Sequence, residues 1–290
     1  MLTLKRLKGN THYIPSPTNI GVYIKGDEAI LIDSGNDKEA GRYILRLLKD
    51  FKLKLIINTH SNADHIGGNS FIQSKTDCRI AASRIEAPFI QDPILEASFL
   101  YGGYPLEKHH NKFLVAKPSN VTDIIGKGKI LDTDLFASPL PGHYFGMLGI
   151  RTPDNVFFIA DSLFPNRIIT KYHLFYILDV QRYLDTLKLL ETSDADIYVP
   201  SHGEPSDDIK GLIEANRSKI QEIASTIRKI CEMPKTSEEI LADVCGHYKI
   251  RLNENQYLLV LSTIRSYLSY MSKKKLLSYY FNEGRMLWSA

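Results

Sequence analysis

Three side chains that bind metals lie within six positions of one another, at His60, Asp64 and His65. Neutral imidazoles and carboxylates are the ligands that zinc and similar divalent ions take in proteins. Gly67 and Gly68 follow directly, and we expect them to allow a sharp turn that points Asp64 and His65 into one cavity. This short segment therefore predicts a divalent metal site.

Further candidate ligands lie far away in the sequence, at places where the chain leaves a strand. Apolar runs that predict strands lead into Asp33, His60, Asp161 and His202, and a Pro-Leu-Pro-Gly loop leads into His143. In open α/β architectures, sites form where strand ends meet the loops that follow them. We therefore expect these side chains to converge.

The elements that must position these residues alternate between strand and helix over the first two hundred residues, which is an α/β pattern. Strands are predicted at 19–24, 29–32, 53–59, 79–82, 130–139, 148–151, 156–160 and 197–199. Helices are predicted at 38–51, at 69–76 and from an N-cap at Asp179. The aromatic-rich segment 84–126 predicts either a lid over the site or ordinary core packing.

The composition changes after Pro205. Residues 209–231 and 253–271 have helical patterns, and Thr236 to Glu239 resembles a capping box that starts another helix. Residues 276–281 and 285–288 flank Asn-Glu-Gly, a hairpin signal. We expect two domains: residues 1–205 carry the candidate ligands, and residues 206–290 form a small helical, winged-helix-like domain.

Bulk properties indicate an ordinary globular protein. Of the 290 residues, 43% are hydrophobic and 24% charged, and the net charge is +3. The N-terminus lacks the long apolar run of a signal peptide or membrane anchor, so we expect a cytoplasmic protein with no membrane partner. The three cysteines have no metal-binding spacing and are expected to be inert.

The ordered set of candidate ligands resembles the metallo-β-lactamase superfamily. Its pattern is His-x-His-x-Asp-His, then a distant His, an Asp and a final His, preceded by an Asp after an early strand. The candidate residues follow this order over roughly residues 15–205. The resemblance implies an α/β fold, a four-layer αββα sandwich, followed here by the winged-helix-like appendage.

The resemblance also implies a ligand set for two metals. One metal would use His60, His143 and a second motif histidine; the other would use Asp64, His65 and His202, with Asp161 bridging. Asn62 stands where the pattern has that second histidine, and its neutral oxygen matches zinc less well than imidazole does. We therefore expect one tight Zn²⁺ site and a second, weaker site with Asn62 as a poorer ligand; Mn²⁺ and Fe are the other metals considered.

A divalent ion lowers the pKa of its bound water from about 15.7 to about 7, and the resulting metal-bound hydroxide attacks a carbonyl or phosphoryl centre. Asp64 is the candidate catalytic residue, because it would orient this nucleophile and carry its proton. Asp33 is expected to hold in place the loop that carries His60, Asp64 and His65, called the motif loop below, or to bind the second nitrogen of a histidine ligand.

Other polar residues have weaker indications. Lys171, Tyr172 and His173 lie between Asp161 and His202 in the sequence and are candidates for binding a substrate carboxylate or phosphate, although the sequence favours an exposed loop over this role. His109 and His110 are expected to be a solvated pair.

The leading hypothesis is a metallo-hydrolase that acts on an ester-type bond of a small molecule, a thioester or a lactone, as in the glyoxalase II group. The alternatives are a metal-dependent nuclease or phosphodiesterase, an iron-dependent enzyme of the sulfur dioxygenase type, and a non-catalytic binding module. Residues 206–290 contain 13 Lys and Arg against 10 Asp and Glu, too small a surplus to favour nucleic acid. The helices of this tail would pack beside the cleft or form a homodimer contact.

Overall fold

The structure is a computed structural model that describes residues 3–290. The chain forms two compact units, each described here by itself. Unit 1 contains residues up to Pro141, Phe145–Ser162 and Ser193–Ile209; unit 2 contains Gly142–Tyr144, Leu163–Thr192 and Lys210–Ala290. The units interleave along the chain, whereas the sequence suggested one boundary after residue 205. That domain division stays a prediction, and its first two residues, Met1 and Leu2, lie outside the described residues.

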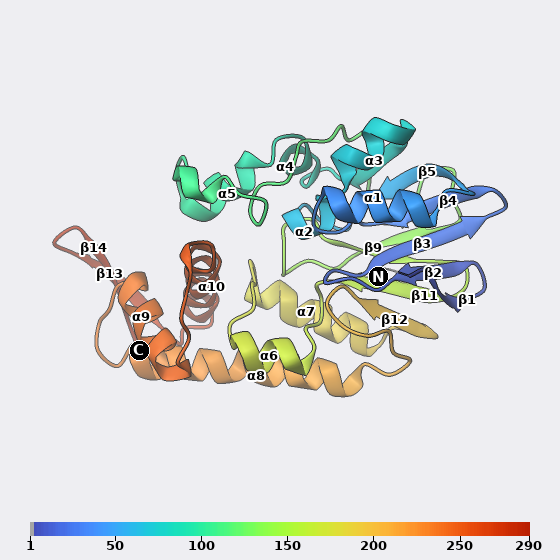
Figure 1. The fold of residues 1–290 in the computed structure, drawn as a ribbon. Helices are drawn as coiled ribbons and strands as arrows, with labels where there is room; N and C mark the ends of the chain where they lie inside the picture. Colours follow the sequence, from blue (N-terminus) through green and yellow to red (C-terminus); the bar gives the residue numbers. More distant parts are fainter. Residues whose placement is uncertain (1–2) are drawn as a thin grey trace. The chain divides into compact units, whose positions relative to one another are not determined.

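Two β-sheets form the frame of unit 1 (Figure 1). The first sheet has the order β1-β2-β3-β4-β5-β6-β7, antiparallel as far as β4 and parallel beyond it. Its strands are β1 (Lys5–Lys8), β2 (Thr11–Ile14), β3 (Ile20–Lys25), β4 (Glu28–Ile32), β5 (Lys52–Ile57), β6 (Arg79–Ser83) and β7 (Asp123–Ile125). The second sheet has the order β12-β11-β10-β9-β8, with only the β11–β12 pairing parallel. Its strands are β8 (Gly128–Lys129), β9 (Phe136–Pro139), β10 (Leu148–Arg151), β11 (Val156–Ala160) and β12 (Ile197–Pro200).

The two faces of the first sheet bury different sets of apolar side chains. Alternate residues of a strand point to opposite faces, so Ile30 and Leu31 of β4 enter different clusters. Ile30 packs with residues of the second sheet such as Phe158, which makes the core between the sheets. Leu31 packs on the other face with Ile44 and Ile72. Unit 1 is thus a helix–sheet–sheet sandwich.

Short helices accompany the first sheet, and Figure 1 shows α1 and α3 on its outer side. They are α1 (Lys38–Leu47), α2 (Ala63–Ile66), α3 (Asn69–Thr76), α4 (Ala87–Gln91), α5 (Ile94–Tyr101) and the 3₁₀ turn η1 (Glu107–His109). Asp37 caps α1 by accepting hydrogen bonds from the amides of Glu39 and Ala40. This helix ends at Leu47, earlier than the predicted residue 51, because the chain must enter β5 at Lys52.

Other predicted boundaries also need correction. The predicted strand 130–139 is β9 only, because Leu131 takes a positive φ of 48° and the Thr133 hydroxyl closes a turn on the Ile130 carbonyl. The hairpin β1–β2 was not predicted. Neither were α4 and α5, whose starts are set by Pro88 and Pro93 within an aromatic-rich segment.

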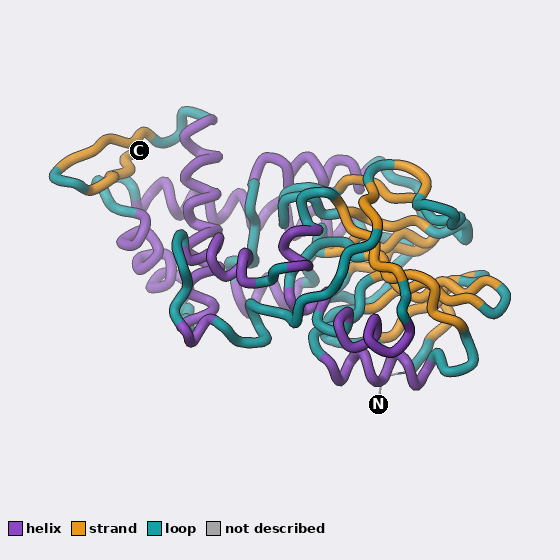
Figure 2. The backbone as a smooth tube through the Cα atoms, turned by 90° about the horizontal axis from the view of Figure 1, so that it is seen from above, coloured by secondary structure: helices purple, strands orange, loops and turns teal. Residues whose placement is uncertain are grey.

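Unit 2 is mainly helical. Its elements are α6 (Asn166–Tyr172), α7 (Val180–Glu191), α8 (Lys210–Ile230), α9 (Ser237–Tyr248), α10 (Glu254–Lys273), β13 (Ser278–Asn282) and β14 (Arg285–Ser289). The predicted N-cap at Asp179 and the predicted capping box of Thr236 with Glu239 are both confirmed. The last two strands pair as the predicted hairpin at the end of the chain (Figure 2). Three helices and a hairpin are the expected elements, while the winged-helix arrangement stays a prediction.

No helix among residues 3–290 is both long and apolar enough to cross a lipid bilayer. Cys78 and Cys231 are buried free thiols, and Cys245 is a partly buried free thiol. Their inertness stays a prediction.

Candidate metal centre

The candidate ligands of unit 1 lie where its strands end. His60 follows β5, and the hydrogen bonds Asn58 N to Ala81 O and Leu148 N to Thr59 O hold the backbone that leads to it. Asp161 follows β11, and His202 follows β12 beside it. The carboxyl ends of parallel neighbouring strands meet at one edge, so residues far apart in sequence come together there.

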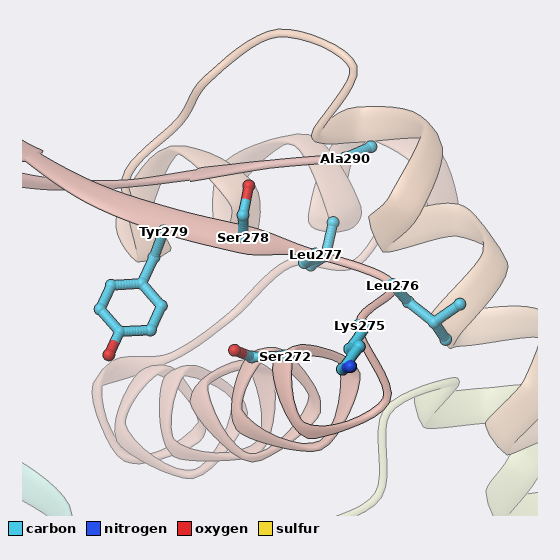
Figure 3. Close-up of a pocket in the computed structure, with 7 residues that line it drawn as sticks. All are labelled: Ser272, Lys275, Leu276, Leu277, Ser278, Tyr279 and Ala290. Carbon is cyan, nitrogen blue, oxygen red and sulfur yellow. The ribbon is translucent and has the colours of Figure 1, made fainter.

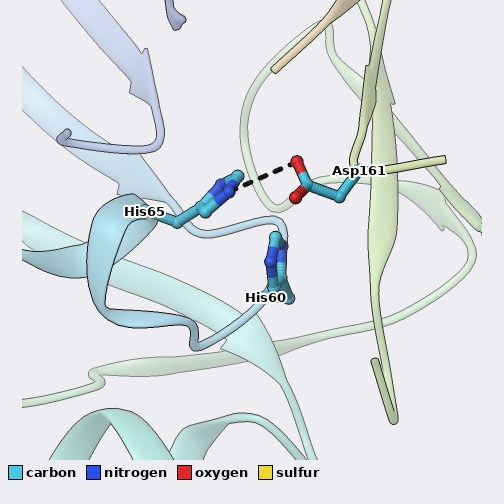
Figure 4. A group of neighbouring side chains, drawn as sticks. All are labelled: His60, His65 and Asp161. Atoms are coloured by element: carbon cyan, nitrogen blue, oxygen red, sulfur yellow. Dashed lines mark ion pairs between the residues drawn. The ribbon is translucent and has the colours of Figure 1, made fainter. Parts of the chain in front are cut away.

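Five predicted ligands gather into two overlapping groups. The first contains His60, His65 and Asp161 (Figure 4), and the second contains Asp64, His65 and His202; within each group the ligand atoms lie within 4.8 Å of one another. His65 Nε2 is 3.4 Å from Asp161 Oδ1 and 3.8 Å from Asp64 Oδ2. His202 Nε2 is 3.2 Å from Asp161 Oδ2 and 3.5 Å from Asp64 Oδ2. Asp161 and Asp64 thus face the same two imidazoles.

Asp33 orients His65 from behind. Its Oδ2 lies 2.8 Å from His65 Nδ1 and accepts the Thr59 hydroxyl at 2.7 Å, while its Oδ1 accepts the Thr59 amide at 2.8 Å. Because a carboxylate only accepts hydrogen bonds, Nδ1 of a neutral His65 carries the proton and Nε2 carries the lone pair. His65 Nε2, whose lone pair would bind a metal, therefore faces the other candidate ligands of the two groups.

The other two histidines are held in the same way. Nδ1 of His202 lies 2.8 Å from the Pro17 carbonyl, and Nδ1 of His60 lies 3.0 Å from the Thr59 hydroxyl. A carbonyl can only accept, so Nε2 of a neutral His202 also carries the lone pair. Metal-binding histidines commonly have such a partner on the second nitrogen.

The loop before β3 braces the site, a role that the sequence did not reveal. The buried Thr18 hydroxyl donates to Asp64 Oδ2 at 2.7 Å. The Asn19 side chain donates to the carbonyls of Pro200 at 2.9 Å and Gly203 at 2.6 Å, on both sides of His202.

Gly67 and Gly68 have a different role from the predicted one. Both have negative φ in the helical region, so no special turn requires them. A Cβ at Gly67 would lie 2.4 Å from the Asn36 carbonyl carbon, and one at Gly68 would lie 2.4 Å from the Ser34 carbonyl oxygen. They are needed because the chain that follows Asp33 passes close to the motif loop.

The carboxylates of the two ligand groups favour positive charge on the groups beside them. Burial alone would raise the pKa of Asp161, but His202 and His65 outweigh it and hold that pKa well below its usual range. Burial alone would lower the pKa of His202, but Asp161 and Asp64 outweigh it and raise that pKa to about 9. Without a metal, protons on the imidazoles balance the carboxylates, and a divalent cation would displace them.

The hydrogen bonding of the candidate ligands is also consistent with a bound divalent metal. His65 Nε2 is buried and makes no hydrogen bond within residues 3–290. Buried polar atoms are nearly always satisfied, and an unsatisfied one in a native structure often marks a site for an ion or a water. An imidazole and carboxylate donor set is one that zinc accepts.

His143 belongs to unit 2, and the two groups above consist of unit 1 residues. It is buried, and its Nδ1 lies 2.9 Å from the Tyr176 carbonyl, an arrangement like that of His202. The preceding Gly142 has a φ of 126°, and a Cβ there would lie 2.3 Å from the Tyr183 amide nitrogen. The role of His143 as a ligand stays a prediction.

Two buried glutamates next to the motif loop were missed by the sequence analysis. Glu86 accepts hydrogen bonds from the Ser61 amide at 3.0 Å, the Ser61 hydroxyl at 2.6 Å and the Gly146 amide at 2.6 Å. Glu96 Oε1 accepts from Asn62 Nδ2 at 2.6 Å. Burial raises the pKa of both carboxyls. The available signal was a single acidic residue within an otherwise apolar stretch in each case.

The residues proposed for substrate binding lie in unit 2, where other contacts engage them. Lys171 Nζ lies 4.7 Å from the Tyr172 ring centroid. His173 Nδ1 lies 3.1 Å from Lys219 Nζ, and its ring stacks on Tyr248 at 4.8 Å. Their role toward a substrate stays a prediction.

The expectation of a solvated histidine pair is wrong for His109. His109 is buried beside Tyr101, at 5.8 Å between ring centroids, whereas His110 is exposed. His109 is the last residue of the 3₁₀ turn η1, and His110 follows it as the C-cap. Tyr104 and Phe113 of the same segment are exposed, and the proposed lid stays a prediction.

A pocket in unit 2 lies in another part of the chain (Figure 3). Its lining offers no histidine or carboxylate side chain and one amine, from Lys275, so it lacks the donors of a metal site. The lining residues are Ser272, Lys275, Leu276, Leu277, Ser278, Tyr279 and Ala290.

Known proteins resemble the chain in both sequence and structure. The family model described as "Metallo-beta-lactamase superfamily" matches residues 13–202. The probable metallo-hydrolase YqjP of Bacillus subtilis (strain 168) is 23% identical, over 95% of this chain and 95% of that protein.

Solved structures share the fold. A beta-lactamase domain protein from Burkholderia ambifaria has a TM-score of 0.77 at 17% identity, covering 99% of this chain and 93% of its own. A metallo-beta-lactamase family protein from Thermus thermophilus has a TM-score of 0.75 at 18% identity, covering 100% of this chain and 98% of its own. A metallo-beta-lactamase from Pontibacter korlensis covers only 76% of this chain, with a TM-score of 0.57 at 16% identity. The first two likenesses therefore include the C-terminal helices.

Proposed function

The chain belongs to the metallo-β-lactamase superfamily, has its fold and is a metallo-hydrolase, and we propose that it hydrolyses an ester-type bond, a thioester or a lactone, in a small molecule. The observation that carries the proposal is the convergence of Asp64, His65, Asp161 and His202. When bound there, a divalent cation would lower the pKa of water enough to supply a hydroxide nucleophile near neutral pH, and would polarise the bond under attack.

The protein's own residues would divide the remaining work. Asp161 is nearly inaccessible, with 5% of its side chain exposed, and its two oxygens face His65 and His202. Asp64 has 41% of its side chain exposed, and one oxygen is held by the Thr18 hydroxyl. Asp64 is therefore the carboxylate positioned to orient the attacking water and accept its proton.

The ligand types at each site predict how tightly it would bind a metal. The site of Asp64, His65 and His202, bridged by Asp161, combines imidazoles with carboxylates and would hold Zn²⁺ tightly. The second site would use His60 and the bridging Asp161, and Asn62 stands where an imidazole would complete the set. It would hold its metal more weakly.

The test combines elemental analysis with a substrate panel. Protein purified without added metal should contain zinc and hydrolyse a thioester or a lactone, and chelation should abolish both properties. An Asp64→Ala, His65→Ala double variant should lose metal and activity together, while a matched exposed change, His110→Ala, should lose neither. If wild-type protein cannot be loaded with any divalent ion, the metallo-hydrolase mechanism fails; faster cleavage of a phosphodiester would replace the ester proposal with a nuclease.

A further inference from the structure

The hairpin at the end of unit 2 has one open strand edge. β13 pairs with β14, and no other strand among residues 3–290 pairs with it. The outer edge of β14 is different, because Trp288 exchanges backbone hydrogen bonds with Lys235 at 2.8 and 3.1 Å. All five residues of β13 are exposed, and Figures 1 and 2 show the hairpin extending away from the helices α9 and α10. The outer edge of β13 is therefore accessible to another strand.

The turn of the hairpin determines which backbone groups point to this edge. The turn has two residues, so the pair that flanks it, Asn282 with Arg285, exchanges hydrogen bonds. Bonded and non-bonded pairs alternate along an antiparallel ladder, and Tyr279 and Phe281 therefore direct their backbone N–H and C=O groups away from β14. Trp288, opposite Tyr279, agrees with this alternation, because its backbone binds outside the hairpin. Tyr279 and Phe281 thus each present one donor and one acceptor at the outer edge.

The side chains of β13 lack the features that usually protect an exposed strand edge. Proteins commonly block such an edge with lysine, other charged residues or proline. The sequence of β13 is Ser-Tyr-Tyr-Phe-Asn, with none of these. Its aromatic side chains are also accessible, with exposed fractions of 51% for Tyr279, 44% for Tyr280 and 72% for Phe281. An uncharged, aromatic edge of this kind favours pairing with a strand of another chain.

We propose that β13 is a dimerisation strand, which pairs antiparallel with β13 of a second copy of this chain about a two-fold axis at Tyr280. In this register Tyr279 of each copy lies opposite Phe281 of the other, and these two residues exchange their outward backbone bonds. Tyr280 lies opposite Tyr280 of the second copy. Each exposed aromatic residue of β13 then faces an aromatic residue, a type of cross-strand pair that stabilises antiparallel sheets. The strand is thus complementary to itself, as a two-fold symmetric interface requires.

The charges at the two ends of β13 favour the antiparallel direction. Exposed Lys274 and Lys275 precede the strand, whereas exposed Glu283 follows it. Antiparallel pairing places Glu283 of one copy diagonally across from Lys275 of the other, while parallel pairing would bring the lysines of both copies together. Glu283 also lies 3.4 Å from Arg285 of its own hairpin, so its charge selects the direction of pairing more than it adds affinity.

The size of the contact predicts a reversible dimer. One five-residue strand from each copy is a small interface compared with those of permanent dimers. The paired backbone groups and aromatic side chains would stabilise the contact, but each copy loses freedom of motion on association. We therefore expect monomer and dimer to exchange, with a dissociation constant in the micromolar range.

The experiment measures the mass of the full chain in solution by sedimentation velocity, from low to high micromolar concentrations. The wild type should change from monomer to dimer as its concentration rises. Tyr280→Lys and Tyr280→Glu each place like charges opposite one another at the two-fold axis, and each should weaken dimerisation at least about tenfold. An equimolar mixture of the two variants should dimerise again, because lysine then faces glutamate. Tyr257→Lys on α10, where the tyrosine is 41% exposed, is the matched control and should dimerise like the wild type.

A backbone variant tests the strand pairing separately from the side chains at Tyr280. Phe281→Pro removes an outward N–H while the hydrogen bonds to β14 remain, and it should also weaken the dimer. Circular dichroism of each variant should match the wild type, and recovery of the dimer in the mixture would show that both Tyr280 variants are folded. A wild type that stays monomeric at the highest concentration, an undiminished dimer in Tyr280→Lys, or a mixture that dimerises no better than either variant alone would overturn the proposal.

Discussion

Replacing Asp33 by Asn tests whether this buried side chain sets the geometry of the metal centre. Asp33 is 2% exposed, and its two oxygens accept hydrogen bonds from the Thr59 amide, the Thr59 hydroxyl and His65 Nδ1. It has a left-handed φ of 63°, a conformation that Asn adopts nearly as readily as Asp. The substitution therefore removes the charge and one acceptor while the backbone keeps its shape.

The magnitude follows from the bonds that change. An Asn oxygen at the Oδ2 position keeps the bonds to His65 and the Thr59 hydroxyl, but its NH₂ then faces the Thr59 amide, donor against donor. A hydrogen bond to a charged group contributes about 1.5–3 kcal/mol, and a buried unsatisfied donor costs a similar amount. We expect the free energy of unfolding of the metal-free protein to fall by about 2 kcal/mol. Metal affinity should fall about 10–100-fold, the usual effect of losing the partner of a histidine ligand.

The assay pairs urea denaturation of metal-free protein with competition between the protein and a chelator for zinc. Asp37→Asn is the matched control, because Asp37 caps α1 with a side chain that Asn replaces well. Its stability should stay within about 0.5 kcal/mol of the wild type, and its zinc affinity should not change.

Unchanged zinc affinity in Asp33→Asn would refute the argument, because His65 would then keep its orientation without the charged partner. An equal loss of affinity in Asp37→Asn would also refute it, since the effect would then be a general consequence of removing an acidic charge from this segment.

Three further predictions concern other parts of the chain. Asp161→Asn removes the carboxylate within 3.4 Å of two imidazoles, so elemental analysis should find no tightly bound zinc; full retention would contradict the bridging role. Gly142→Ala places a Cβ 2.3 Å from the Tyr183 amide nitrogen at a φ of 126°, and denaturation should show a loss of at least about 3 kcal/mol. Burial, followed by the nearby Lys219 charge, lowers the pKa of His173, so unfolded protein binds this proton more readily. Stability should therefore fall as pH drops through about 6.5, and His173→Gln should flatten that slope between pH 7 and pH 5; an unchanged slope would contradict the assignment.

Much of the metal centre could be predicted because several of its candidate ligands are neighbours in the sequence. His60, Asp64 and His65 share one short loop, and their residue types are sufficient to suggest a metal. Asp161 and His202 could be added because each follows an apolar run, and strand ends converge in an α/β fold.

The supporting residues could not be predicted in the same way. Thr18, Glu86 and Glu96 are ordinary residue types, and their roles depend on which backbone or side-chain donor the fold brings to them. The partner of His202 Nδ1 is the backbone carbonyl of Pro17. Because every residue has such a carbonyl, the residue type gives no signal of this contact.

Part of the fold was predictable for a similar reason. Strands such as β4 and β5 contain short runs of consecutive apolar residues, and such a run bounded by turn signals predicts a buried strand. The helices α4 and α5 were missed, because their segment has aromatic residues without a clear helical period and is interrupted by Pro93.

The sequence by itself determined the family, the α/β alternation and the identity of the candidate ligands, since each is a matter of residue type, order and local period. Only the tertiary structure decided which nitrogen each histidine turns toward the centre, why Gly67 and Gly68 must lack side chains, and what faces Asn62. Those features depend on atoms from segments distant in sequence meeting within about 3 Å, and hydrogen bonds depend steeply on distance and angle. Residue order carries no direct signal of such a meeting.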